Sequence, residues 1–228
     1  MSHSTITTVA LGLLAALPSV SAADSSLYYK LRVRVTGPKT EATPQIDGWP
    51  VELRKLPVNT HNVPADWLWG VLWNPGNADS RGGDTFYTQT DGDKTRVRGS
   101  LPDRTTQFGF ENNDGTGLAL SSVNIPGLQL LGNQEAEAQI ADADGIPILE
   151  EVGTGASFVA CNLTSYSPVW ANLYWTNLAK WGTDPIYNTD PSWMNCTEIQ
   201  LVPECFSEGP EYDGLEETSC LTDITTVL

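Results

Sequence analysis

The stretch Tyr29-Lys30-Leu31-Arg32-Val33-Arg34-Val35 decides the fold of this chain, because its residues alternate strictly between apolar and basic. Successive side chains of an extended strand point to opposite faces, so a period of two separates the apolar residues from the bases. The pattern predicts a half-buried strand over Leu27–Thr36, with its apolar face against a core.

Short apolar runs separated by turn signals follow this strand. Asp91-Gly92 and Asp144-Gly145 are two such signals. Trp67–Trp73 is apolar on both faces and is predicted to be a central strand covered on both sides. The other expected strands are Val51–Leu56, Thr85–Thr88, Thr95–Leu101, Gln107–Glu111, Leu118–Val123, Gly127–Leu131, Ile146–Glu150, Ala156–Cys161, Val169–Thr176 and Thr197–Pro203.

This succession of short strands predicts an all-β fold, an antiparallel β-sandwich with a closed barrel as the alternative. Gln134–Ala141, rich in Ala, Glu and Gln, is the one short helix expected. We expect a single β domain over residues 23–203. Residues 204–228 are acidic and poor in large apolar side chains, so they are predicted to form an irregular tail stapled by one disulfide.

An apolar run from Val9 to Leu17 precedes the small residues Val20-Ser21-Ala22. The run is too short to span a bilayer, which needs roughly 20 apolar residues, and it fits a signal peptide over residues 1–22. Cleavage is expected after Ala22, with Ala23 as the alternative, although no Lys or Arg precedes the run. No later segment is apolar enough to cross a membrane, so the sequence predicts a secreted, extracellular protein.

Charge is distributed unevenly along the chain. The net charge is −16, from 12 basic and 28 acidic residues. Residues 1–104 contain eleven of the bases and ten acids, whereas residues 105–228 contain Lys180 alone against eighteen acids. The second half would repel a polyanion, so we expect neither nucleic acid nor an anionic membrane as partner. Solubility outside the cell is the simplest interpretation of the acidic half.

Four cysteines, all in the last third of the chain, allow three disulfide pairings. We favour Cys161–Cys196 together with Cys205–Cys220. The second would close a loop rich in Glu, Gly and Pro, where a disulfide is worth roughly 3 kcal/mol. Zinc is the competing interpretation. The sequence has no CxxC pair and only His61 beyond the signal peptide, so no metal site is predicted.

Two acceptor motifs for N-linked glycosylation adjoin these cysteines, Asn162-Leu163-Thr164 and Asn195-Cys196-Thr197. If the first disulfide forms, glycans on Asn162 and Asn195 would share one patch. We expect the second motif to be the weaker acceptor, because its middle residue is a cysteine that can be oxidised first.

Ser157–Cys161 is an apolar strand ending in Cys, Ser167–Trp175 ends Leu-Tyr-Trp, and Asn195–Glu204 holds a second Cys before Leu-Val-Pro. Together with Tyr29–Gly37, these segments resemble a family of small secreted proteins of filamentous fungi whose domain has no known function. The resemblance covers the two ends of the chain and not its middle. It implies a secreted, mostly β protein with a Cys161–Cys196 disulfide, and it brings no catalytic residue.

The sequence contains few recognisable catalytic motifs. A serine or cysteine nucleophile needs a base, but His61 lies in a polar stretch and no GxSxG motif exists. Glycosidases use two carboxylates about 5–9.5 Å apart, whereas Glu150 and Glu151 would point to opposite faces of a strand. No catalytic residue and no cofactor is assigned, and a carboxylate-dependent hydrolase such as a glycosidase is the alternative function.

A partial match to a calcium-binding EF-hand loop occurs at Asp142-Ala143-Asp144-Gly145, with Glu151 as the last ligand. The first ligand position is Ile140 instead of Asp, so we interpret the match as chance. A looser calcium site would need Asp91 and Asp93 beside these residues.

Aromatic residues are in greatest excess, with 8 Trp and 7 Tyr. Trp67, Trp69 and Trp73 lie on the strand that is apolar on both faces, so we expect them in the core. A second cluster is the predicted binding surface, because exposed rings stack on sugars and part of the cluster lies in a polar loop. Its members are Trp170, Tyr174, Trp181, Tyr187 and Trp193.

A basic stripe is formed by Lys30, Arg32 and Arg34, joined by Arg96 and Arg98 on a later strand. It could bind an acidic polysaccharide, pair with the chain's own acidic half, or be a plain solvated face, which is the commonest case.

These observations predict a secreted non-enzymatic protein that binds cell-wall carbohydrate or a host or surface partner through exposed aromatics. The expected partner is a polysaccharide or an extracellular protein. The alternatives are the hydrolase and a structural or effector-like protein without a small ligand.

Overall fold

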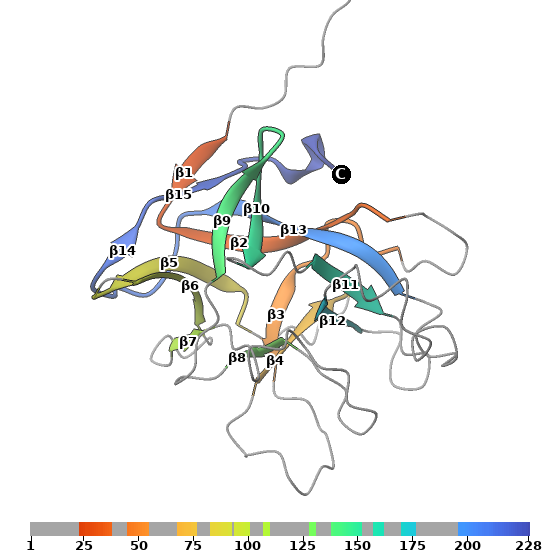
Figure 1. The fold of residues 1–228 in the computed structure, drawn as a ribbon, viewed down its shortest axis with the longest axis horizontal. Helices are drawn as coiled ribbons and strands as arrows, with labels where there is room; N and C mark the ends of the chain where they lie inside the picture. Colours follow the sequence, from red (N-terminus) through yellow and green to blue (C-terminus); the bar gives the residue numbers. More distant parts are fainter. Residues whose placement is uncertain are drawn as a thin grey trace, which may run out of the picture.

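The protein is described from a computed structural model. The structure describes residues 23–37, 45–54, 68–76, 83–92, 94–100, 107–109, 128–130, 138–151, 157–161, 170–176 and 196–228. These residues form short strands and one 3-10 turn, η2 (Ile224–Thr226) (Figure 1). The strands are β1 (Asp24–Ser26), β2 (Tyr28–Val35), β3 (Val51–Arg54), β4 (Leu68–Trp73), β5 (Thr85–Asp91), β6 (Lys94–Ser100), β7 (Gln107–Gly109), β8 (Leu128–Leu130), β9 (Ala138–Ala143), β10 (Ile146–Glu151), β11 (Ser157–Cys161), β12 (Trp170–Thr176), β13 (Cys196–Phe206), β14 (Leu215–Glu216) and β15 (Thr218–Cys220).

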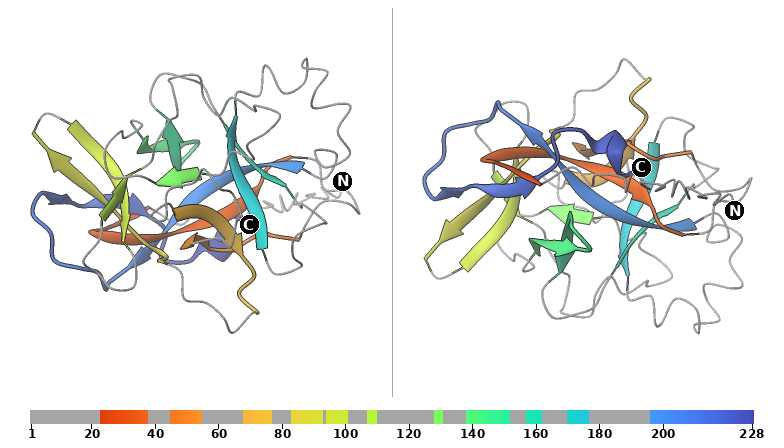
Figure 2. Two further views of the ribbon diagram at one scale, coloured as in Figure 1. Left: turned by 90° about the horizontal axis from the view of Figure 1, so that it is seen from below. Right: turned by 90° about the horizontal axis from the view of Figure 1, so that it is seen from above.

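Most strands belong to one antiparallel sheet, which curls into a half-barrel (Figure 2). The order along the sheet is β3-β4-β12-β11-β13-β2-β5-β6-β7, with β8 beside β4 and β14 beside β5. Two further antiparallel pairs are β1 with β15 and β9 with β10. The all-β, antiparallel class predicted from the sequence is therefore confirmed.

β2 lies in the middle of this sheet, between β13 and β5. Its pairing with β13 extends over eight positions, the longest in the described sheet. Tyr29, Leu31 and Val33 are buried, whereas the three bases between and after them are half-buried. The period of two predicted for this strand is confirmed, because each apolar residue meets the core and each base meets the surface.

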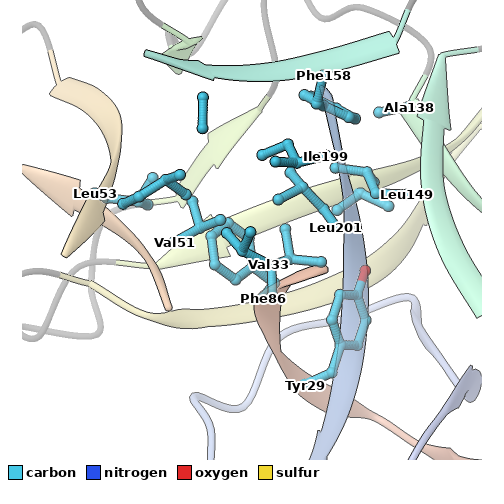
Figure 3. Close-up of a cluster of buried hydrophobic side chains, with 14 of the residues drawn as sticks. Tyr29, Val33, Val51, Leu53, Phe86, Ala138, Leu149, Phe158, Ile199 and Leu201 are labelled. Atoms are coloured by element: carbon cyan, nitrogen blue, oxygen red, sulfur yellow. The ribbon is translucent and has the colours of Figure 1, made fainter. Parts of the chain in front are cut away.

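The main core lies between the curled sheet and the β9–β10 hairpin (Figure 3). A second, smaller cluster occupies the other side of β13, because Val202 alternates with Leu201 along that strand. Val202 packs there against Leu221 and Ile224. The buried members of the main core are Tyr29, Leu31, Val33, Ile46, Val51, Leu53, Leu72, Phe86, Val97, Ala138, Leu149, Phe158, Ala160, Ile199, Leu201 and Cys220.

The β9–β10 hairpin contributes Ala138 and Leu149 to this core. Asp144 and Gly145 form its turn with positive φ angles of 56° and 85°, as the tight turns of hairpins require. The amide of Gly145 donates a hydrogen bond to Asp142 Oδ1 at 2.9 Å, which closes the turn. Asp142 and Asp144 therefore belong to a hairpin turn.

The helix predicted over Gln134–Ala141 is wrong for Ala138–Ala141, which belong to β9, and Gln134–Glu137 lies outside the described residues. Helix propensity differs among ordinary residues by only tenths of a kcal/mol. Pairing with β10 and burial of Ala138 outweigh it.

The irregular tail predicted over residues 204–228 is also corrected. β13 continues to Phe206, and the segment beyond it contains β14, β15 and η2. The side chain of Asp223 caps η2 by accepting a hydrogen bond from the amide of Thr225 at 2.9 Å. Leu221 and Ile224 are buried, so this segment contributes to the core of the domain predicted to end at residue 203.

The remaining strand predictions agree with the structure. Each described strand from β2 to β13 overlaps a predicted one, except β9. Leu72 and Trp73, which point to opposite faces of β4, are both buried, as expected of a strand that is apolar on both faces. The predicted strand Leu118–Val123 and the signal peptide, residues 1–22, lie outside the described residues. Within the described ranges, no helix has the length and apolarity needed to cross a membrane.

Candidate functional site

The residues of the predicted aromatic surface belong to β12 and to the segment between β12 and β13. β11 pairs antiparallel with both strands, so β12 and β13 run parallel to each other. Thr176, at the end of β12, is opposite Ser157, whereas Cys196, at the start of β13, is opposite Cys161 at the other end of β11. The two ends that residues 177–195 join, Thr176 and Cys196, therefore lie at opposite ends of β11.

Trp170 and Tyr174 occupy register positions on one face of the sheet. Tyr174 is opposite Val159, which is opposite Glu198, and Trp170 is opposite Trp73. Directly opposite residues share a face, and the core residues of β11 take the alternate positions. The register thus assigns Trp170 and Tyr174 to the face away from the main core.

On β11 and β4, residues of this outer face are shielded from solvent. Val159 is 1% exposed and Trp73 is 7% exposed, so other parts of the chain cover them. Glu198, which shares this face on β13, is exposed. The other three predicted aromatic residues lie outside the described residues: Trp181, Tyr187 and Trp193.

The two predicted cysteine pairs have different outcomes. Cys205 and Cys220 form a disulfide with Cα atoms 5.1 Å apart, which confirms that pair. Cys161 is directly opposite Cys196 across β11 and β13. Opposite Cα atoms of antiparallel strands are about 4.5–5.5 Å apart, within the range that a disulfide requires. The backbone register is therefore compatible with the Cys161–Cys196 disulfide, which stays a prediction.

The basic stripe on β2 is paired within the molecule. Lys30 Nζ lies 2.8 Å from Asp84 Oδ2, and Arg32 Nε lies 2.7 Å from Glu204 Oε2. Arg34 Nη1 donates to the side-chain oxygen of Gln200 at 3.0 Å. Arg32 thus pairs with the acidic half of the chain, which is one of the three interpretations of the stripe.

The second part of the stripe, on β6, also has partners. Arg98 Nη1 donates a hydrogen bond to Gln89 Oε1 on the adjacent strand. Arg96 interacts within the protein as well. The bases of the described stripe are therefore not a free cationic surface.

Part of the segment that was predicted to be an irregular acidic tail packs on β5. We name residues 207–217 the acidic loop, because five of these eleven residues are Glu or Asp. The Cys205–Cys220 disulfide closes it at its base. Leu215 and Glu216 form β14, opposite Gln89 and Thr88 of β5.

Polar contacts hold the acidic loop along its length. The hydroxyl of Tyr28 donates to the carbonyl of Pro210 at 2.5 Å, and Gln89 Nε2 donates to the carbonyl of Asp213 at 2.6 Å. The amide of Thr90 donates to the carbonyl of Gly214 at 2.8 Å. These bonds satisfy backbone carbonyls of a segment that buries few side chains, which explains why no apolar period marks it.

Aromatic rings and glycines complete the fit of this loop. Tyr87 packs against Tyr28 edge to face, and its ring centroid is 5.1 Å from that of Tyr212. Gly209 lies so close to the Tyr28 ring that a Cβ at this position would overlap it. Gly214 has a φ of 73° and approaches the carbonyl of Thr90 too closely for a Cβ. The two glycines are the sequence signal from which a tight loop could have been expected.

A buried hydroxyl network lies beneath the loop. Tyr29 Oη is 3.2 Å from Thr88 Oγ1, and Thr218 Oγ1 donates to Thr88 Oγ1 at 2.7 Å. Burial raises the pKa of Tyr29 far above its usual range, although the bond to Thr88 opposes the shift. Burial also raises the pKa of Tyr87, and the nearby Tyr212 adds to the effect. Both phenols therefore stay neutral, and they link the C-terminal segment to the core.

Two described carboxylates, Glu150 and Asp223, have structural roles. Glu150 accepts a hydrogen bond from Gln139 across the hairpin at 2.7 Å. The hydroxyl of Thr225, followed by its amide, lowers the pKa of Asp223, the opposite direction from the one a general acid needs. No cluster of three or more metal-ligating side chains occurs among the described residues. Four candidate residues from the sequence lie outside them: His61, Asp93, Asn162 and Asn195.

Comparison with known proteins returned no match to a family model, to a curated protein or to a solved structure.

Proposed function

We propose that this protein is a secreted, non-enzymatic protein that binds a polysaccharide of a cell wall. The binding surface combines Trp170 and Tyr174 of β12 with Trp181, Tyr187 and Trp193 of the crossover 177–195. The observation that carries the proposal is the parallel arrangement of β12 and β13 on either side of β11. Trp181, Tyr187 and Trp193 belong to the segment that joins β12 to β13, so we infer that they act together with Trp170 and Tyr174.

The chemistry of these residues supports a carbohydrate ligand. Trp and Tyr combine a large apolar face with a polar edge, so they remain favourable where one side is wet. The crossover itself is rich in Asn, Asp and Pro, which provide few apolar neighbours for three large rings. We infer that these rings stack on the apolar faces of sugar rings.

Charge favours a neutral polymer over an acidic one. Lys30 and Arg32 are engaged with Asp84 and Glu204, and the acidic half of the chain repels polyanions. Chitin, cellulose and β-glucan are neutral polymers of the required kind. The resemblance to small secreted proteins of filamentous fungi supports secretion and names no activity.

Sedimentation with insoluble chitin, cellulose and β-glucan tests the proposal. We expect the secreted protein to be retained on at least one of the polymers and the Trp181→Ala/Trp193→Ala variant to be lost from it. The matched control is Trp181→Phe/Trp193→Phe, which keeps aromatic rings and should keep most of the retention. Thermal unfolding of all three proteins checks that the variants fold.

The outcomes separate the competing functions. Wild type in the supernatant with every polymer would contradict carbohydrate binding and favour a protein partner or a structural role. Release of soluble sugar from a polymer would instead favour the hydrolase.

A further inference from the structure

Several aspartates of the chain are followed directly by glycine, and the fold treats these dipeptides differently. In such a dipeptide the amide nitrogen of the glycine can attack the side chain of the aspartate, because no Cβ on the glycine hinders the approach. The dipeptides are Asp47-Gly48, Asp91-Gly92, Asp114-Gly115, Asp144-Gly145 and Asp213-Gly214. The side chain of Asp91 and the whole of Asp114-Gly115 lie outside the described residues, so the comparison concerns the other three.

Asp47-Gly48 is locked by hydrogen bonds to β2. The amide of Gly48 donates to the carbonyl of Val33 at 2.8 Å. Asp47 Oδ1 accepts a hydrogen bond from the amide of Val35 at 2.7 Å. Both groups that would react are therefore engaged, and the attack of one on the other would break both bonds.

In Asp144-Gly145 the attacking nitrogen is engaged. The amide of Gly145 donates to Asp142 Oδ1 at 2.9 Å, in the turn of the β9–β10 hairpin. Asp144 itself is exposed. This dipeptide is therefore accessible to water, but its nitrogen must leave an acceptor before it can react.

Asp213-Gly214, in the acidic loop, has neither lock. Both residues are exposed, and within the described residues neither the carboxylate of Asp213 nor the amide of Gly214 has a hydrogen-bond partner. Their main-chain carbonyls bond to β5 instead (Figure 1). The carbonyl of Asp213 accepts from Gln89 Nε2 at 2.6 Å, and that of Gly214 accepts from the amide of Thr90 at 2.8 Å. The fold thus holds this dipeptide in place and leaves its two reacting groups in contact with water.

We propose that Asp213 is a site of spontaneous modification, at which aspartate isomerises to isoaspartate. The nitrogen of Gly214 forms a bond to Cγ of the protonated Asp213 carboxyl group. The hydroxyl of that group leaves with the amide proton as water, which gives a cyclic succinimide. A water molecule then adds at the main-chain carbonyl carbon of Asp213, and the bond from this carbon to the nitrogen of Gly214 breaks. One water is lost and one is gained, so mass and oxidation state do not change.

The product does not fit the place that the acidic loop occupies. Its main chain runs through Cβ and Cγ of residue 213, which lengthens the chain by one atom before Gly214. Gly214 already lies so close to the carbonyl of Thr90 that a Cβ would clash with it. The Cys205–Cys220 disulfide fixes the base of the loop, so its ends cannot move apart to take up the extra atom. The isomerised loop therefore leaves β5 and stays attached through the disulfide.

Incubation of the folded, disulfide-bonded protein in warm, mildly acidic buffer tests the inference. Isoaspartate at each dipeptide is quantified by mass spectrometry of proteolytic peptides with electron-transfer fragmentation. We expect it to form at Asp213 at least about fivefold faster than at Asp144, the factor that corresponds to one net hydrogen bond, and to form slowest at Asp47. In the reduced chain unfolded in urea, the three sites should react at similar rates, because the hydrogen bonds that distinguish them are absent.

The matched control is Asp213→Glu, which keeps the charge but would have to close a larger and less favourable ring. It should not isomerise at this position, and its rates at Asp47 and Asp144 should equal those of the wild type. Hydrogen exchange of the Thr90 amide, which bonds to Gly214, should become faster in the wild type as isoaspartate accumulates and stay constant in the variant.

Two results would overturn the inference. One is a rate of isoaspartate formation at Asp213 in the folded protein that is no higher than the rate at Asp144. The other is a Thr90 amide that exchanges as slowly in the isomerised protein as in the fresh one, because the loop would then remain on β5. Retention on polysaccharides enters neither readout, so failure of the proposed function would be recognised separately.

Discussion

β2 and the acidic loop pair with the same strand, β5, and they are held there by opposite means. β2 places alternate apolar side chains in the core, and its pairing with β13 and β5 follows from that burial. The acidic loop buries little and is held by backbone-directed hydrogen bonds, tightly packed glycines and one disulfide. A strand that buries one face can be recognised from the alternation of apolar residues in its sequence. A polar segment that joins a sheet through hydrogen bonds shows no such alternation.

The largest effect should come from the apolar side of the comparison. Leu31→Ala removes a fully buried side chain from the main core, so we expect it to lower the free energy of unfolding by about 2–5 kcal/mol. Urea denaturation measures the loss. Arg34→Ala, three residues along the same strand on the opposite face, should cost less than about 1 kcal/mol. Equal costs for the two variants would contradict the role assigned to β2.

On the polar side, the disulfide should contribute most. Cys205→Ala/Cys220→Ala removes a bridge between residues 15 positions apart and should cost about 3 kcal/mol. Hydrogen exchange of the Thr90 amide, which bonds to Gly214, should become faster. Exchange of the amides of β2 should become faster only by the factor that corresponds to the loss of global stability. An unchanged Thr90 exchange rate would mean that the hydrogen bonds hold the acidic loop without the disulfide.

Two glycines separate local strain from close packing. Gly214 and Gly92 both have positive φ, 73° and 66°, but only Gly214 is crowded, by the carbonyl of Thr90. Gly92→Ala should therefore cost only the strain of its conformation, about 1–2 kcal/mol. Gly214→Ala adds a clash and should cost more, in thermal unfolding of the two variants compared side by side. A Gly92→Ala variant as unstable as Gly214→Ala would show that packing against Thr90 is unimportant.

Alkaline pH should weaken the protein through its buried tyrosines. Burial raises the pKa of Tyr29 and Tyr87, whereas the same phenols in the unfolded chain ionise near pH 10. Above that pH the unfolded state releases protons that the native state keeps. Stability is therefore unaffected by these groups below pH 10 and falls as pH rises further, by about 1.4 kcal/mol per pH unit for each group.

The Tyr29→Phe variant isolates one of these groups. It should show a shallower decline of stability between pH 10 and 11, at the cost of the bond to Thr88. Urea denaturation at several pH values gives the slope. Identical slopes for the variant and the wild type would mean that Tyr29 ionises as readily in the fold as outside it.

The smallest effect should come from the ion pair between Arg32 of β2 and Glu204 of β13. Both side chains are partly exposed, so Arg32→Ala should cost no more than about 1 kcal/mol. The cost should shrink further at high salt, because screening weakens charges that face water. Thermal unfolding at low and high ionic strength measures both quantities, and a salt-independent loss would point to packing of the arginine stem instead.

The strands could be predicted because their residues carry a local signal. β2 alternates, β4 is apolar on both faces, and β11 and β12 are apolar runs bounded by turns. The helix over Gln134–Ala141 was predicted from propensity alone, which pairing with β10 overrode. The segment after Phe206 was predicted as irregular because its contacts are polar and its partners lie far away in sequence.

The candidate site divides in the same way. The choice of Trp and Tyr as binding residues follows from their chemistry, and the Cys205–Cys220 disulfide from the need to close a loop. The register places Trp170 opposite Trp73 and Cys161 opposite Cys196. No local sequence pattern predicts which residues of two distant strands are opposite each other. The same holds for Thr197, which is buried and lies close to Gly37, a residue distant in sequence.

The sequence by itself determined where most strands of the curled sheet form, which face of β2 is buried and where acidity and aromatics concentrate, because these follow from residues within a few positions of one another. Only the tertiary structure decided the strand order, the packing of the acidic loop on β5 and the partners of the basic stripe. The physical reason is separation along the chain: Arg32 meets Glu204 across 172 positions. Which distant segments meet is set by how all the strands together bury their apolar faces, and no short stretch of sequence contains that information.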